Sequence, residues 1–145
     1  MKGLKYFFFI LTFVVISVFT SCTKDNDTDG NNCIADTGGS LTLVVYPRHH
    51  GASIWSHGNY RDTVYVKFNT QVFPGTNPLK YDLALAGDSG EDHVHVEGMK
   101  CGDYYIYATG WDTTLAPPDT IVRGGIPYST EAAYGEIIIN VPVVE

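Results

Sequence analysis

The chain has 145 residues, 44% of them hydrophobic, and a formal net charge of −7 at pH 7. This length has room for one domain, and 15 glycines, 7 prolines and 10 tyrosines favour strands and turns over helices. Because an acidic chain repels phosphate backbones, the charge argues against a nucleic acid partner. We therefore expect a single small β domain.

Residues 1–21 have the features of an export signal. Two lysines precede an apolar run at residues 6–19, and small polar residues follow directly before Cys22. The run is shorter than the roughly 20 residues that span a bilayer, which favours a signal peptide over a transmembrane anchor. The segment FTSC at residues 19–22 resembles the lipobox of bacterial lipoproteins, with phenylalanine in place of the usual leucine. The resemblance implies lipidation of Cys22, with palmitate among the acyl chains, and simple secretion is the alternative.

Residues 22–39 are expected to carry the lipid and to form a flexible tether. The stretch after Cys22, TKDNDTDGNN, is polar and acidic, so it cannot bury enough apolar surface to offset the entropy of ordering. Its acidic residues are similar to the export signal that follows the lipidated cysteine in Bacteroidota-type lipoproteins, although residue 24 is lysine. The resemblance implies an outer membrane lipoprotein of the cell envelope, exposed at the cell surface and held to the membrane by its N-terminal lipid.

Residues 40–145 alternate between strand patterns and turn signals. Successive side chains on a strand leave opposite faces, so runs in which every second residue is apolar predict strands with one buried face. Strands are predicted at residues 40–47, 63–68, 81–86 and 136–144, two strands within residues 93–112, and two short edge strands at 120–122 and 126–128. Glycine- and proline-rich segments separate them. Pro47, which lacks an N–H, indicates that the first strand lies at the edge of a sheet.

The most regular alternation lies in residues 93–112. Val94 and Val96 share one face, opposite His93 and His95. After a turn at Gly102, the expected core positions are Tyr104, Ile106 and Ala108, and the expected solvent-facing positions are Tyr105, Tyr107 and Thr109. About seven short strands without a helical period predict an all-β fold, an antiparallel seven-stranded β-sandwich.

The segment VEGMKCGDYYIYA, residues 96–108, is similar to the F-x-x-L-x-x-G-x-Y-x-L-x-A signature of transthyretin-like (prealbumin-like) and carboxypeptidase-regulatory-like β-sandwiches. The matching positions are Val96, Met99, Gly102, Tyr104, Ile106 and Ala108. The resemblance implies that Met99 plugs one end of the sandwich and that Tyr104 re-enters the core after the turn. A shared fold does not confer function. The hydroxyisourate hydrolases of this family end in Tyr-Arg-Gly-Ser, whereas this chain ends in NVPVVE, so that activity is not expected.

Cys33 and Cys101 remain after lipidation of Cys22, and an exported protein meets an oxidising compartment. We expect these two residues to form a disulfide that fastens the root of the tether to the sandwich, contributing roughly 4 kcal/mol by loop closure. Two unpaired thiols are the alternative. No base lies near Cys101 in the sequence, so a thiol enzyme is not expected.

The histidines are candidate metal ligands. His93 and His95 lie two apart on a strand and project from the same face about 6.5–7 Å apart. Histidines in the preceding loop would complete a zinc or copper site if that loop folded over this face; they are His49, His50 and His57. Exposed histidines beside tyrosines also need no metal to explain them, and no cofactor is expected on the leading hypothesis.

Aromatic residues in predicted loops are the remaining candidates. Trp55, between His50 and His57, is expected to contact an envelope protein or glycan partner, and Trp111 either does so or caps the core. No catalytic constellation is found. The leading hypothesis is a non-enzymatic, membrane-anchored structural or interaction module, and the alternative is a metal-binding envelope protein.

Overall fold

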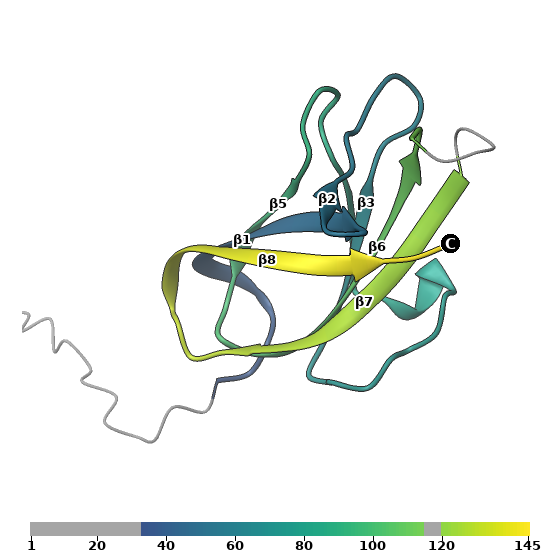
Figure 1. The fold of residues 1–145 in the computed structure, drawn as a ribbon. Helices are drawn as coiled ribbons and strands as arrows, with labels where there is room; N and C mark the ends of the chain where they lie inside the picture. Colours follow the sequence, from purple (N-terminus) through teal and green to yellow (C-terminus); the bar gives the residue numbers. More distant parts are fainter. Residues whose placement is uncertain (1–32, 115–119) are drawn as a thin grey trace, which may run out of the picture.

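The computed structural model describes residues 33–114 and 120–145, which form a sandwich of two β-sheets (Figure 1). The predicted signal peptide, the lipidation site at Cys22 and the first part of the predicted tether lie outside these residues. The strands of the described residues are β1 (Thr37–His49), β2 (Ala52–Ser53), β3 (Thr63–Phe68), β4 (Leu83–Ala86), β5 (Val94–Met99), β6 (Gly102–Asp112), β7 (Thr120–Thr130) and β8 (Tyr134–Val143). A single 3-10 turn, η1, spans Pro78–Lys80. Within the described ranges, no helix has the length and apolar character needed to cross a bilayer.

The prediction of a wholly antiparallel fold is wrong at one pair of strands. The second sheet, in the order β4-β3-β6-β7, is antiparallel throughout. In the first sheet, β5 and β2 pair antiparallel with β1, but β8 pairs parallel with β1 from Ser40↔Tyr134 to His49↔Val143. The chain crosses from β7 in the second sheet to β8 in the first, and β8 then runs in the same direction as β1. The described residues contain eight strands, because a two-residue strand, β2, is added and the two predicted edge strands within residues 120–128 form one strand, β7.

Two further expectations about strands are corrected. β1 is an inner strand, flanked by β8 on one side and by β5 and β2 on the other. Pro47 is tolerated there because it falls between the end of the β5 pairing at Val45 and the start of the β2 pairing at Arg48. β7 is one continuous strand that includes Gly124 and Gly125. Glycine is required at residue 124 because an added Cβ there would lie 2.1 Å from the carbonyl oxygen of Pro142.

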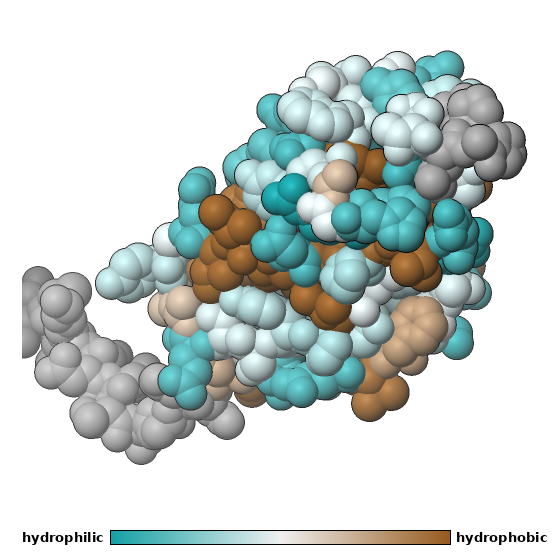
Figure 2. Space-filling model, viewed as in Figure 1, coloured by the Kyte–Doolittle hydropathy of each residue, from teal (hydrophilic) through white to brown (hydrophobic). Residues whose placement is uncertain are grey.

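The core lies between the sheets and contains the residues that the alternation predicts. Val94, Val96, Met99, Tyr104, Ile106 and Ala108 are all buried, as are the inward residues of β1, β3 and β8. The outward face of β8 is not purely polar, because Ile138 on it is 67% exposed and Tyr134 is 79% exposed. Figure 2 shows hydrophobic residues at the surface among polar ones on the side where β8 runs in front.

The outer face of β6 is not exposed to solvent as the alternation predicted. Tyr105 and Tyr107 are buried because the segment between β3 and β4 lies across them. The Phe73 ring centroid is 5.5 Å from that of Tyr105, and the Tyr81 ring stacks on Tyr107 at 5.7 Å. A strand pattern alone cannot show that a loop covers its polar face.

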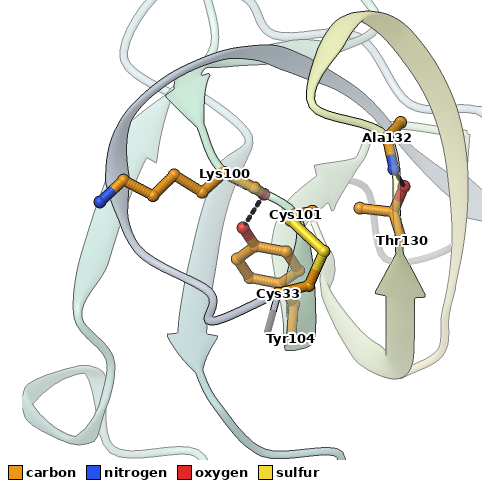
Figure 3. The surroundings of a disulfide bond; sticks show 6 residues. All are labelled: Cys33, Lys100, Cys101, Tyr104, Thr130 and Ala132. Atoms are coloured by element: carbon orange, nitrogen blue, oxygen red, sulfur yellow. Dashed lines mark hydrogen bonds between the residues drawn. A yellow bond between two sulfur atoms is a disulfide. The ribbon is translucent and has the colours of Figure 1, made fainter. Parts of the chain in front are cut away.

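The turn between β5 and β6 is fastened by a disulfide (Figure 3). Cys33 and Cys101 are bonded, with their Cα atoms 5.0 Å apart, which confirms the predicted pairing. The Tyr104 hydroxyl donates a hydrogen bond to the carbonyl oxygen of Lys100 in the same turn. Gly102 has φ +140° and an added Cβ there would lie 2.3 Å from Ala35 N, so glycine is required. β1 begins at Thr37, three residues before the start of the predicted first strand.

Candidate metal-binding sites

The five histidines do not gather in one place. Two groups of metal-ligating side chains occur in residues 33–114 and 120–145, and in each the ligand atoms lie within 4.8 Å of one another. One group is Glu91, His93 and His95, and the other is His49, His50 and Glu145. His49, the last residue of β1, and His50, the next residue, therefore belong to a second group with Glu145 instead of completing the first.

His93 and His95, expected from the strand rise to project about 6.5–7 Å apart, turn their rings toward each other. Their Nε2 atoms are 2.9 Å apart, and Glu91 Oε2 lies 3.7 Å from His93 Nε2. Ligands bound at about 2.0–2.1 Å in a tetrahedron lie a little over 3 Å apart, so small rotations would place all three atoms around one ion. His95 is exposed and Glu91 is partly exposed, so the site opens to solvent.

The orientation of His93 is fixed by its neighbours. Asp92 Oδ1 lies 3.0 Å from His93 Nδ1, and the Tyr46 ring stacks on the imidazole at 5.0 Å. Burial raises the pKa of Asp92, but hydrogen bonds from His93 and Ser53 outweigh it, so the net shift is downward. An ionised carboxylate accepts from Nδ1–H and leaves the Nε2 lone pair free for a metal, which is the usual role of a carboxylate behind a metal-ligating histidine.

The second group lies where β1 and β8 end side by side. His49 is only 3% exposed, and its Nδ1 lies 2.7 Å from Asp112 Oδ2. Hydrogen bonds from Thr114 and from His49 lower the pKa of Asp112 against the opposing effect of burial. The His49 and His50 rings are 4.1 Å apart between centroids.

His57 belongs to neither group. Its Nδ1 lies 2.8 Å from the carbonyl oxygen of Trp55, and its ring lies 5.6 Å from that of Tyr60. Trp55 is 57% exposed, as a contact residue needs to be, whereas Trp111 is half-buried and packs on Tyr60 at 4.8 Å between ring centroids.

The sequence interpretation missed the carboxylates of both groups. Glu91 is absent from the expected ligands, although it stands two positions before His93, as His95 stands two after it. That spacing was a usable signal. Asp112 and Glu145 lie far from the histidines in the sequence. The pairing of β8 with β1 brings Glu145 close, and the packing of one sheet on the other brings Asp112 of β6 to His49.

No protein-family model matches the chain, and no curated protein matches it. Among solved structures, a DUF4876 family protein from Bacteroides thetaiotaomicron aligns with 72% of this chain at 18% sequence identity and a TM-score of 0.42. The aligned region is 24% of that chain, so this chain spans about a quarter of its length. What this chain shares with that protein is a distant structural similarity, which carries no argument about activity, ligand or partner.

Proposed function

We propose that this chain is a membrane-anchored envelope lipoprotein whose β-sandwich binds a zinc or copper ion through Glu91, His93 and His95. The observation that carries the proposal is the 2.9 Å approach of the two Nε2 atoms while Asp92 engages Nδ1 of His93. In the metal-free protein one Nε2–H donates to the other nitrogen. With both lone pairs turned to an ion, the two imidazoles and the carboxylate form a set that suits zinc or copper.

The proposed role is binding rather than catalysis. Glu91 and His93 lie just before β5 and His95 lies within it, and the exposed His95 leaves a bound ion open to water. Catalytic metal sites work in shaped pockets from which water is excluded. An open site suits uptake, storage or transfer of the ion at the cell envelope.

The proposed location and fold family rest on the sequence. The FTSC segment at residues 19–22 and the acidic stretch after it support a Bacteroidota-type outer membrane lipoprotein with lipid on Cys22. The burial of Val96, Met99 and Tyr104 at the signature positions supports a transthyretin-like sandwich.

A second candidate is the structural or interaction module that the sequence favoured first. Trp55 is 57% exposed, and the outward face of β8 carries Ile138 and Tyr134, both largely exposed. Exposed aromatic and aliphatic side chains of this kind suit an envelope protein or glycan partner. The metal proposal ranks higher because its ligand atoms already converge.

The test is zinc and copper titration of the metal-free, full-length chain in detergent, followed by calorimetry. The variant His93→Ala/His95→Ala is expected to bind one equivalent less than the wild type, whereas His57→Ala, a histidine outside both groups, keeps the wild-type stoichiometry. Equal stoichiometry in the wild type and the double variant would refute the proposal and leave the interaction module as the leading function.

A further inference from the structure

His49 is a buried imidazole with one nitrogen engaged and one without a partner. Asp112 accepts on both oxygens, because Thr114 donates to Oδ1 through its N–H at 2.8 Å and its hydroxyl at 2.6 Å, while Oδ2 lies 2.7 Å from His49 Nδ1. His49 Nδ1 is therefore the donor, and the lone pair of the neutral ring is on Nε2. This Nε2 atom is buried and has no hydrogen-bond partner among the described residues. Buried polar atoms are rarely left unpaired without a reason.

The backbone brings a second imidazole to the same place. Consecutive residues of an extended strand point to opposite faces, so His49 and His50 would normally diverge. His50 instead has φ +48° and Gly51 has φ +83°, and this tight turn between β1 and β2 brings the two rings to 4.1 Å between centroids. A left-handed conformation at a residue other than glycine is unfavourable, and such residues concentrate at functional sites.

The parallel pairing supplies the third ligand. His49 is in register with Val143 at the end of β8, so Glu145, two residues further on, arrives beside the end of β1. One ligand atom from each of His49, His50 and Glu145 lies within 4.8 Å of the others. The ligands of a zinc or copper site are thus present as two imidazoles and a carboxylate. A second carboxylate, that of Asp112, orients one of the imidazoles.

The surroundings allow an ion to enter. An open pocket of about 680 Å³ is lined by His50, Gly51 and Val144, close neighbours of His49 and Glu145 in the chain, and His50 itself is exposed. Arg48 lines the same pocket, but its guanidinium donates to Asn140 Oδ1 at 2.9 Å and to Ser53 Oγ. These two hydrogen bonds fix the position of the guanidinium.

We propose that His49, His50 and Glu145 form a second metal site, in which Asp112 is a positioning residue for His49. This site shares no ligand with the Glu91, His93 and His95 group, and it does not depend on the function proposed for that group.

The test uses the full-length chain in detergent, metal-free, with His93→Ala/His95→Ala as the background. This background is expected to bind one equivalent of zinc. Adding His50→Ala, at an exposed side chain, is expected to weaken that binding at least tenfold, and adding Asp112→Asn about 10–100-fold. Adding His57→Ala is the matched control and is expected to leave the affinity unchanged.

Far-ultraviolet circular dichroism of each variant checks that the sandwich is retained, and His50→Ala, at an exposed residue, keeps the test valid if Asp112→Asn unfolds. The proposal is overturned if the background binds no zinc, or if folded His50→Ala binds zinc as tightly as the background. The reciprocal variant, His50→Ala with His93 and His95 intact, keeps one equivalent if the first site is real. Failure of one site is thereby distinguished from failure of the other.

Discussion

Replacing Asp62 with asparagine is expected to raise the free energy of unfolding at neutral pH. Asp62 is fully buried, and neither of its carboxylate oxygens has a hydrogen-bond partner of normal geometry in the described part of the chain. Burial raises the pKa of this carboxyl from 3.8 to about 6, against the opposing effects of the Ser56 hydroxyl and the charge of His57. At neutral pH the fold therefore holds a poorly compensated negative charge.

The sign and size follow from proton linkage. The pKa of Asp62 is higher in the folded state than in the unfolded state, so the folded state binds the proton more tightly. The contribution of this group to stability is therefore fully present below about pH 3.8. This stability is lost as the pH rises through about 6. A shift from 3.8 to about 6 corresponds to about 3 kcal/mol, as an upper value, at about 1.36 kcal/mol per pH unit.

The assay is urea unfolding followed by tryptophan fluorescence, at intervals between about pH 3.5 and pH 7.5. The stability of Asp62→Asn relative to the wild type is expected to increase by about 2–3 kcal/mol across this range, because asparagine stays neutral. Any constant cost of the amide cancels in this comparison. Asp88→Asn is the control, since the Asp88 side chain is 83% exposed. A stability difference that does not change with pH would refute a buried, destabilising charge at Asp62.

Three further outcomes are expected. Replacing Cys33 and Cys101 with serine opens a loop with a sequence separation of 68 residues and should lower the free energy of unfolding by about 4 kcal/mol in urea titrations. A loss below about 1 kcal/mol would contradict the loop-closure reasoning. Gly124→Ala places a Cβ 2.1 Å from the carbonyl oxygen of Pro142 and is expected to lower the melting temperature. A melting temperature equal to that of the wild type would show that the β7 to β8 contact is not close. Asp92→Asn should weaken zinc binding at the Glu91 group about 10–100-fold in calorimetry while leaving the stoichiometry intact, and unchanged affinity would exclude its positioning role.

Local patterns predicted those parts of the fold in which neighbours in sequence determine the structure. The strand at residues 63–68 has the predicted bounds, because its β-branched residues alternate cleanly between two turns. The buried residues Val94, Val96, Tyr104, Ile106 and Ala108 follow from the same two-residue period, whereas the close approach of the His93 and His95 rings does not. The disulfide was predicted from the export signal and the number of cysteines, and it is confirmed.

The features that the sequence did not predict all depend on contacts between distant segments. The parallel pairing of β8 with β1 leaves no mark on either strand, because a half-buried strand alternates in the same way beside either kind of neighbour. The second metal group needs this pairing to bring Glu145 to His49. Tyr105 and Tyr107 read as solvent-facing because Phe73, which covers them, lies some 30 residues earlier in the chain.

The pairing of β1 with β8 also sets how the domain resists a pulling force. The two strands run parallel from Ser40↔Tyr134 to His49↔Val143, so a pull on the start of β1 against the end of β8 acts along the strands in opposite directions. The evenly spaced hydrogen bonds of the parallel pair are then loaded together in shear and must break together. The Cys33 disulfide passes part of the same load to the turn before β6. A domain held at its N-terminal side can in this way bear tension across the whole sandwich.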